Sequence, residues 1–422
     1  MTVRNQTLTP GRIAVPTRFS LAVAFLCSLM LAAHSGEPKS DAVVLRKIAQ
    51  AAVEANGKPD AASMKQVRGL VAGLSDAKVR ADMTAILPLW EQSAARHARD
   101  RLLLAEIKRL GGKAIIEVQA PAWLRSSAGD EALSAFGRIV EIELNERTDG
   151  HKDPIPKKLA DRVTDDWLKK LADQSELRRL ELSGTAVTSA GLVHLKNLTN
   201  LEKLNVCLTA VDDRGFEHLA GLTKIKRMIV CSSKITGSGF QHCQAMKQIE
   251  SINLHSSPAS DTGLEAIGKF TSLLRLEIVH TNVTDAGLKH LAGLVNLQQL
   301  HIHGPKTTEA ALPFLVQLKE LYQLDVYDRA ASNLTVEQVG KLPKLRMLML
   351  VNGNFDDDSV KHLAKLTTLE ELSLDSSKMT EASIEHLAGL GNLRKLHLGR
   401  TKISAAGRDR LKTLLPKVEM AR

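Results

Sequence analysis

Aromatic residues are scarce in this chain of 422 residues: phenylalanine, tryptophan and tyrosine together make up 3%. A hydrophobic core with so few rings must be built from aliphatic side chains. The sequence also lacks the G-x-S-x-G, P-loop and H-E-x-x-H motifs, so nothing supports a nucleophilic hydrolase, a P-loop enzyme or a zinc protease. Gly237-Ser238-Gly239 begins like a dinucleotide-binding loop, but His242 stands where the last glycine is needed. We therefore expect no enzyme and no cofactor.

A 24-residue unit repeats ten times between Leu177 and Pro416 without an insertion or deletion. Its consensus reads approximately LxxLxLxxTxVTDxGLxHLxxLxx. The copies begin at Leu177, Leu201, Ile225, Ile249, Leu273, Leu297, Leu321, Leu345, Leu369 and Leu393. A fixed period of this kind is typical of a solenoid, in which each unit buries its apolar face only against its neighbours.

Each unit predicts a strand followed by a short helix. Apolar and polar residues alternate in the first half, as in Leu201–Val206, and stacked copies of such a strand must form a parallel sheet. Apolar residues at every third position, as in Leu288, Leu291 and Leu294, then anchor a helix against that sheet. Because helices are wider than strands, we expect the sheet to line the inside of a curve, with roughly 50 Å of concave surface.

One position before each helix is Thr, Ser or Asp in all ten copies. Such side chains accept hydrogen bonds from free backbone N–H groups, which predicts a helix N-cap. The residues are Thr188, Asp212, Thr236, Ser260, Thr284, Thr308, Ser332, Asp356, Thr380 and Ser404. A small residue three places further on, such as Gly263 or Gly287, is expected to let the helix pack closely.

Cysteine is rare, with four residues in the chain, one of which is Cys27 in an N-terminal apolar run. The other three are an odd number, which argues against a full disulfide framework. Cys243 stands where other repeats place leucine, so we expect it in the core. Cys207 and Cys231 share one position on neighbouring strands, about 4.8 Å apart. Parallel Cβ directions on such strands disfavour a bond between them, and the sequence does not settle whether they are bonded.

The N-terminus predicts an export signal over residues 1–35. Basic residues precede the apolar run Phe19–Ala33, which is short for a membrane span. Ala33-His34-Ser35 then offers small residues for cleavage. We expect an exported protein (periplasmic, cell-envelope or extracellular), with membrane attachment only through an uncleaved signal anchor.

Residues 36–112 predict a helical region, with a break at Gly73–Asp76, with Pro88 starting or kinking the last helix and with Gly111-Gly112 ending it. Residues 113–158 predict a capping segment with irregular strands at 114–118 and 139–144 and a short helix at 129–136. The repeat domain is expected over residues 159–422, starting with an irregular copy.

The repeat as a whole resembles the leucine-rich repeat superfamily. The phrases Thr284–Leu288 and His290–Leu294 resemble secreted or envelope leucine-rich repeat proteins of planctomycete-type bacteria, and the units are also similar to the cysteine-containing class of F-box-type proteins. The resemblance covers about residues 160–416. It implies an α/β horseshoe with a parallel concave sheet and convex helices, and recognition of a protein or other ligand. No F-box-like segment is recognisable upstream.

Six histidines occupy one repeat position on the helix, which makes them architectural rather than catalytic. They are His194, His218, His242, His290, His362 and His386. The outward strand positions (three, five, seven and eight of each unit) are the better candidates for binding. Across repeats four to eight they hold His255, Glu277, His280, His301, His303, Asp325, Tyr327, Met347, Met349 and Val351.

His301 and His303 are two residues apart and are expected to point the same way. With a neighbouring carboxylate they could bind zinc, copper or nickel. No helix or loop supplies an enclosing ligand, so we favour a polar recognition surface and expect no metal site. Met347, Met349 and Val351 form an apolar spot beside these residues, and Ile229, Cys231, Cys207 and Leu208 form a second, as is usual for binding patches.

The formal net charge is +10, and basic residues gather near the C-terminus. They are Lys395, Arg400, Lys402, Arg408, Arg410, Lys412, Lys417 and Arg422. They indicate either a solvated end cap or attraction to an anionic polymer or membrane surface. The concave face mixes both signs without a basic stripe and stacking aromatics, so we expect no nucleic acid.

The favoured hypothesis is a non-enzymatic recognition or scaffold protein that binds a protein or cell-envelope ligand on its concave sheet. The alternatives are a metal-binding protein or metal-dependent enzyme using His301 and His303, and an F-box-like ubiquitin ligase adaptor. A third possibility places the function in the N-terminal helical region.

Overall fold

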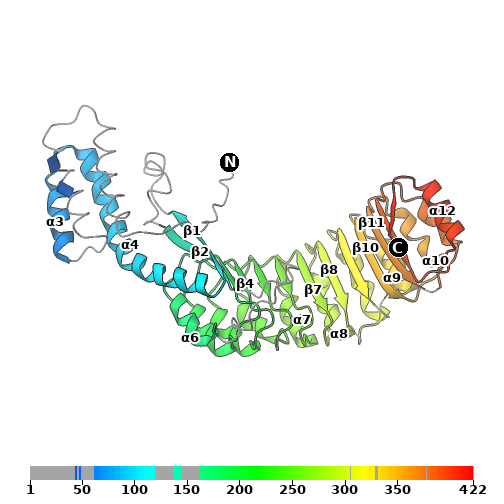
Figure 1. Cartoon of the computed structure of the whole chain (residues 1–422). Coiled ribbons are helices and arrows are strands. Elements are labelled where there is room, and N and C mark those ends of the chain that lie inside the picture. Colours follow the sequence, from blue (N-terminus) through cyan, green and yellow to red (C-terminus); the bar gives the residue numbers. More distant parts are fainter. Residues whose placement is uncertain are drawn as a thin grey trace. The chain divides into compact units, whose positions relative to one another are not determined.

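The computed structural model describes residues 43–44, 47–48, 61–118, 137–144, 162–304, 306–327, 331–376 and 378–421 (Figure 1). The chain divides into two compact units, Met1–Ile142 and Glu143–Arg422. The expected signal peptide and the expected helix at 129–136 lie outside the described residues. Within the described ranges, no helix combines the length and the apolar character that a bilayer span requires.

The first unit contains helices α3 (Ala61–Ala72) and α4 (Ala77–Arg109) and strands β1 (Lys113–Val118) and β2 (Gly137–Glu143). The predicted break between the helices is confirmed, and Asp76 caps α4 by accepting hydrogen bonds from the N–H groups of Lys78 and Val79. Pro88 does not start a helix, because it lies within the 33 residues of α4. Gly111, with a φ of 81°, follows the end of α4 as expected. β1 and β2 match the two predicted strands.

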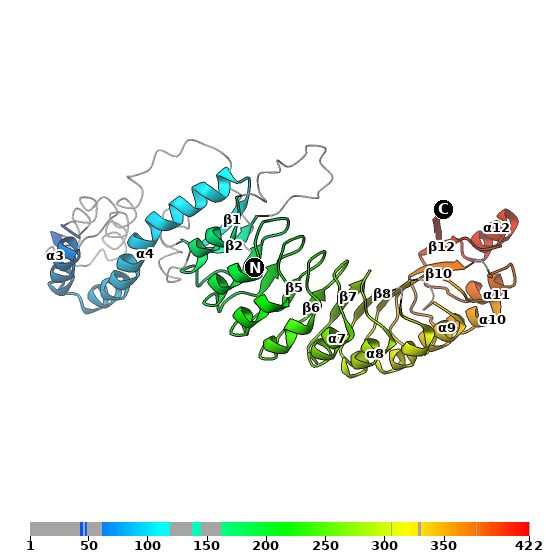
Figure 2. The ribbon, with the colours of Figure 1, turned by 90° about the horizontal axis from the view of Figure 1, so that it is seen from below.

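The second unit is an α/β solenoid of the leucine-rich repeat type. Its strands lie in chain order and pair in parallel, each offset by one 24-residue repeat, as in Leu276↔Leu300 and Leu300↔Leu324 (Figure 2). The strands are β3 (Arg179–Glu181), β4 (Lys203–Asn205), β5 (Arg227–Ile229), β6 (Ser251–Asn253), β7 (Arg275–Val279), β8 (Gln299–His303), β9 (Gln323–Tyr327), β10 (Met347–Gly353), β11 (Glu371–Ser376), β12 (Lys395–Gly399) and β13 (Glu419–Ala421).

Short α- and 3₁₀-helices cover the other face of this sheet (Figures 1 and 2). The α-helices are α6 (Asp165–Leu168), α7 (Asp261–Ile267), α8 (Asp285–Leu288), α9 (Asn333–Val339), α10 (Asp357–Val360), α11 (Ser383–Ala388) and α12 (Ala405–Leu414). The 3₁₀-helices are η2 (Lys169–Leu171), η3 (Ser189–Leu195), η4 (Asp213–Leu219), η5 (Ser238–Cys243), η6 (Lys289–Gly293), η7 (Glu309–Gln317) and η9 (Leu363–Lys365). The tighter 3₁₀ winding suits turns of so few residues.

Aliphatic side chains form the core between the sheet and the helices, as the low aromatic content predicts. Leu276, Leu300 and Leu324, one repeat apart, are fully buried, and each such burial contributes about 1.5–3 kcal/mol. Phe216 and Phe240 pack edge to face with ring centroids 4.9 Å apart. The expectation that Cys243 is a core residue is confirmed, and burial raises the pKa of its thiol to about 12.

The predicted N-caps are confirmed in eight of the ten repeats, where the helix begins directly after the predicted residue. In the other two, the helix begins later, after Gly237 and Ala382. Even there the threonine hydroxyl accepts from a backbone N–H: Thr236 from Ser238 at 3.4 Å and Thr380 from Ala382 at 3.3 Å. The polar side chain therefore serves the same purpose in all of them.

In several repeats an aspartate at the helix start forms hydrogen bonds that join it to the next repeat. The Asp261 carboxylate accepts from both the backbone N–H and the hydroxyl of Thr284, at 2.8 and 2.6 Å. Asp165, Asp213, Asp285 and Asp357 bind the threonine of the following repeat in the same way. Gly287 is required here because a Cβ at that position would overlap the Asp261 carboxylate. The Asp that directly follows the N-cap residue, as in Ser260-Asp261, is thus an inter-repeat link.

Gly237 interrupts this row of carboxylates. It stands where other repeats have the linking Asp, and the backbone N–H of Ser260 instead donates to the carbonyl of Thr236 at 3.0 Å. The φ of Gly237 is 88°, in the left-handed region that glycine tolerates. A side chain would be strained here, so the link passes through the backbone.

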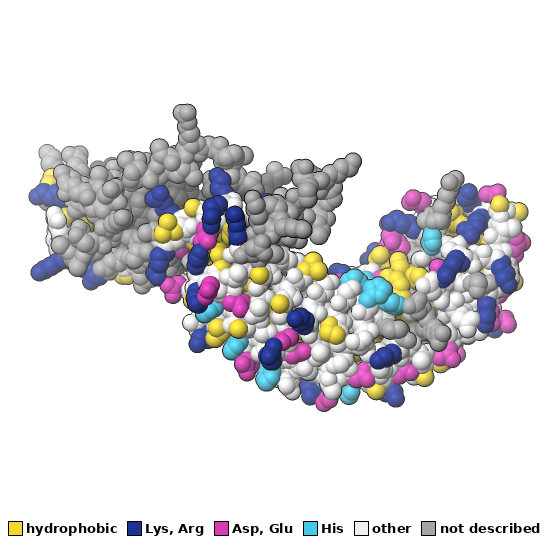
Figure 3. Space-filling model, turned by 60° about the horizontal axis from the view of Figure 1, so that its bottom comes forward, with side chains coloured by type: hydrophobic (Ala, Val, Ile, Leu, Met, Phe, Trp, Pro, Cys, Tyr) yellow, Lys and Arg dark blue, Asp and Glu magenta, His cyan; other side chains and the backbone are white. Residues whose placement is uncertain are grey.

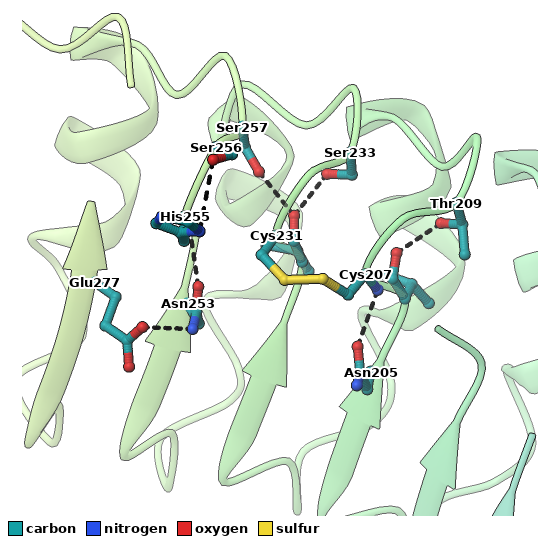
Figure 4. Close-up of a disulfide and its surroundings, with 12 residues drawn as sticks. Asn205, Cys207, Thr209, Cys231, Ser233, Asn253, His255, Ser256, Ser257 and Glu277 are labelled. Carbon is teal, nitrogen blue, oxygen red and sulfur yellow. Dashed lines mark hydrogen bonds between the residues drawn. A yellow bond between two sulfur atoms is a disulfide. The ribbon is translucent and has the colours of Figure 1, made fainter. Parts of the chain in front are cut away.

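Cys207 and Cys231 form a disulfide bond between neighbouring repeats, with their Cα atoms 4.7 Å apart (Figure 4). The sequence argument against this bond assumed regular strands with parallel Cβ directions. Both cysteines instead lie two residues beyond the ends of β4 and β5. The chain enters the left-handed region directly after them, at Leu208 (φ 56°) and Ser232 (φ 49°). The turn, rather than the strand, determines the directions of the two cysteine side chains. The argument against a bond was therefore wrong.

We predict that Asp261→Ala lowers the free energy of unfolding by about 1–3 kcal/mol, because it leaves the Thr284 N–H and hydroxyl without their acceptor. Urea unfolding of the full chain measures the effect. Asp358→Ala is the matched control, because Asp358 also lies in the first turn of a helix but its side chain is 92% exposed. Equal losses in the two variants would contradict an inter-repeat role for Asp261.

We also predict that the aspartates at the helix starts, both N-caps and inter-repeat links, make the solenoid acid-sensitive. Partial burial alone would raise the pKa of Asp261, but hydrogen bonds from Thr284 and Gly287 hold it below its usual value of 3.8. Hydrogen bonds from Arg214 and Ser189 lower the pKa of Asp212 to about 2. A lowered folded-state pKa adds stability that is complete above pH 4 and lost as pH falls toward 2. Melting temperatures from pH 6 to 2 should therefore fall more steeply for the wild type than for Asp212→Asn/Asp261→Asn; parallel profiles would refute this.

We further predict that the disulfide contributes about 2–4 kcal/mol by restricting the unfolded chain. Thiol labelling of the full chain in denaturant without reductant should modify Cys27 and Cys243 and spare Cys207 and Cys231. A reductant should then lower the urea midpoint of the wild type and leave that of Cys207→Ser/Cys231→Ser unchanged. Labelling of Cys207 and Cys231 as well would show that the bond is not formed.

Candidate binding surface on the concave sheet

The predicted candidate residues lie on four neighbouring strands and the turns beside them. Glu277, His301, Asp325 and Met349 are register partners on β7, β8, β9 and β10. Val279 pairs with His303, and Tyr327 pairs with Val351. His255 follows β6 and His280 follows β7. The 24-residue period therefore brings the predicted residues into one continuous area, which we call the concave patch, His255–Val351.

The most buried polar pair of the concave patch is His301 with Asp325. Their Nδ1 and Oδ2 atoms lie 2.7 Å apart, and the side chains are 15% and 10% exposed. A buried carboxylate is costly unless it is paired, so Asp325 places the imidazole proton on Nδ1. The His301 Nε2 atom is buried and has no hydrogen-bond partner among the described residues. The pair is thus largely satisfied from within the protein.

Glu277 is also neutralised by its neighbours. Arg275 Nη2 lies 2.6 Å from its Oε1, and Asn253 donates to its Oε2 at 2.6 Å (Figure 4). The side-chain oxygen of Asn253 also accepts a hydrogen bond from the backbone N–H of His255 at 2.9 Å. Sequence reasoning missed Asn253, although Asn205, two repeats earlier, makes similar bonds: it donates to Glu181 of the preceding strand and accepts from the Cys207 N–H. These bonds fix the floor of the concave patch.

A row of rings crosses the concave patch at the C-terminal ends of strands β6 to β9. Ring centroids are separated by 5.5 Å between His255 and His280, 4.3 Å between His280 and His303, and 5.7 Å between His303 and Tyr327. All three contacts are edge to face, the arrangement that aromatic rings favour. The hydroxyl of Tyr327 continues the row by donating to Met349 Sδ at 3.5 Å. Burial raises the pKa of Tyr327, with a further contribution from Asp325.

The apolar residues of β10 lie at the end of this ring row. Met347, Met349 and Val351 are half-buried and register with Gln323, Asp325 and Tyr327, respectively. Figure 3 shows histidine side chains gathered beside hydrophobic ones on this face. The patch therefore offers ring edges and thioethers next to carboxylates that already have partners.

The backbone at His280 has a φ of 55°, which is unusual for a residue other than glycine. The same repeat position is also left-handed at Leu208, Ser232, Ser256, Asn352 and Arg400. A feature shared by so many repeats belongs to the turn that follows each strand. It orients the His280 ring but does not mark a site by itself.

The hypothesis of a metal site gains no support. Within the described ranges, no three His, Cys, Asp or Glu side chains are grouped so that they could hold a metal ion. One ring nitrogen of His301 is already bonded to Asp325. The six repeat histidines lie on the helical side, at positions from His194 in η3 to His386 in α11, and are partly or fully exposed.

Comparison with known proteins yields similarities of fold. The chain matches no protein-family model, and it matches no curated protein. Among solved structures, an internalin from Listeria monocytogenes is 18% identical, with a TM-score of 0.46, over 67% of this chain and 86% of that one. A leucine-rich repeat protein from Leptospira interrogans is 17% identical, with a TM-score of 0.44, over 60% and 74% of the two chains. The ectodomain of the Arabidopsis receptor kinase HAESA, in complex with a peptide hormone, is 19% identical, with a TM-score of 0.43, over 56% and 40%. At these identities the similarity concerns the fold alone.

Proposed function

We propose that this protein is a non-enzymatic recognition protein that binds a protein partner on the concave patch, His255–Val351. The observation that carries the proposal is the continuous row from the His255 ring to the Met349 thioether. Rings and methionines are enriched at the centres of protein interfaces, and methionine adapts to irregular partner surfaces.

The polar chemistry of the patch favours a protein partner over a small charged ligand. Asp325 and Glu277 are each compensated by a neighbouring side chain. What remains available is apolar and aromatic surface with a polar border, which is the usual composition of an interface. Strands β6 to β10 span roughly 20 Å at about 4.8 Å each, enough to contact five or six residues of an extended chain.

The proposal places the protein outside the inner membrane, as a periplasmic, cell-envelope or extracellular protein. The support is the N-terminal export signal predicted from the sequence together with the Cys207–Cys231 disulfide, because such bonds persist in oxidising compartments. A cell-envelope ligand and an uncleaved signal anchor remain part of this proposal. No observation on the described residues favours the ubiquitin-adaptor or metal alternatives.

We predict that His303→Ala/Tyr327→Ala/Met349→Ala weakens partner binding by about 100-fold, because it removes the centre of the interface. The His301–Asp325 pair is left intact so that no buried charge is stranded. A partner is first identified by crosslinking from the native envelope, and its affinity is then measured for each purified variant.

The matched control is His218→Ala/His290→Ala/His386→Ala on the helical side, which should bind within about twofold of the wild type. Circular dichroism melting checks that both variants remain folded. Unchanged affinity of the concave variant, or equal loss in the helical control, would overturn the placement of the site.

A further inference from the structure

A cavity of about 800 Å³ lies along the edge where strands β8 to β12 begin. The residues immediately before these strands line it in register, and their backbones are joined from repeat to repeat. They are Gln298, Tyr322, Arg346, Glu370 and Arg394, joined by Lys417 from the end of the chain. None of them belongs to the concave patch. The cavity is open to solvent on one side, and its volume lies within the range of small-molecule sites.

Both acidic side chains of this cavity are occupied by neighbours. Glu320 Oε2 lies 2.6 Å from Lys344 Nζ. Glu370 Oε1 lies 2.7 Å from Arg346 Nη2. Each pair joins one repeat to the next, so their charges cancel locally.

Arg394 and Lys417 are different, because among the described residues neither forms an ion pair. Most other basic residues near the C-terminus have partners: Lys395 with Glu371, Arg400 with Asp375, Arg410 with Glu385, Lys412 with Asp409, and Arg408 with the Leu398 carbonyl. Lys402 also forms no ion pair among the described residues, but it does not line the cavity. Four cations and two anions line the cavity, which leaves 4 − 2 = +2. The two uncompensated cations therefore share one hollow.

The side chains that form the walls of the cavity are held by hydrogen bonds to the backbone and to each other. Asn392 donates to the Thr367 carbonyl at 2.7 Å, and Thr368 donates to the Leu345 carbonyl at 2.6 Å. The hydroxyl of Tyr322 accepts from the Gln299 amide at 2.5 Å. A ligand would meet preformed walls, which reduces the ordering cost of binding.

We propose that this cavity binds a small anionic ligand through a carboxylate or phosphate group held by Arg394 and Lys417. The planar guanidinium of Arg394 matches two oxygens of either group, and the ammonium of Lys417 adds a point charge. Of the basic residues near the C-terminus, Lys417 would then serve this site.

The test is isothermal titration of the full-length protein with citrate and, separately, with inorganic pyrophosphate. We expect saturable binding of at least one probe at one per chain; citrate alone would identify a carboxylate ligand and pyrophosphate alone a phosphate ligand. Arg394→Gln/Lys417→Gln should weaken that binding by about tenfold or more, because charge-assisted hydrogen bonds are lost. Both side chains are exposed, so the melting temperature should not change.

The matched control is Lys402→Gln/Lys412→Gln, which removes the same charge from exposed residues outside the cavity. It should bind the probe as the wild type does. Equal weakening in this control, or no saturable binding of either probe by the wild type, would overturn the proposal. The variant His303→Ala/Tyr327→Ala/Met349→Ala should retain the probe, so this test is independent of the concave patch.

Discussion

Each repeat of the solenoid completes its hydrogen bonds only through the next one. The strand amides find carbonyls one repeat away, and the Asp261 carboxylate takes the N–H and hydroxyl of Thr284 at the next helix start. The leucine core is closed in the same way, since no single unit can bury its own apolar face. Sheet, helix starts and core therefore all require the constant 24-residue offset.

That constant offset also creates the surfaces on which binding is proposed. Equal repeat positions become spatial neighbours, so Glu277, His301 and Asp325 meet although each is 24 residues from the next. Polar side chains in such rows find partners on either side, as Asp325 does with His301. Surface chemistry is then decided by what each repeat places at its variable positions, while the frame stays the same.

The sequence predicted the solenoid, the parallel sheet, the N-caps and the buried Cys243, because each depends on a pattern that recurs within one repeat. It also predicted which residues would lie together on the concave side. The Asp261–Thr284 link was missed, since its partners are 23 residues apart and belong to different repeats. The Cys207–Cys231 bond was judged wrongly, because the left-handed turn after the strands redirects both side chains. Ring contacts such as His280 with His303 depend on that turn as well.

Side chains that depart from the neighbour-to-neighbour pairing are the informative ones. Lys226 with Glu202, Lys344 with Glu320 and Arg346 with Glu370 show how the edge of the sheet neutralises its charges along the stack. Arg394 and Lys417 lack such an ion pair among the described residues, and Met347 and Val351 leave apolar surface beside bonded polar groups. A repeat array does not need either feature in order to fold, because its stability comes from the paired positions. The two proposed binding sites therefore rest on these departures from the paired pattern.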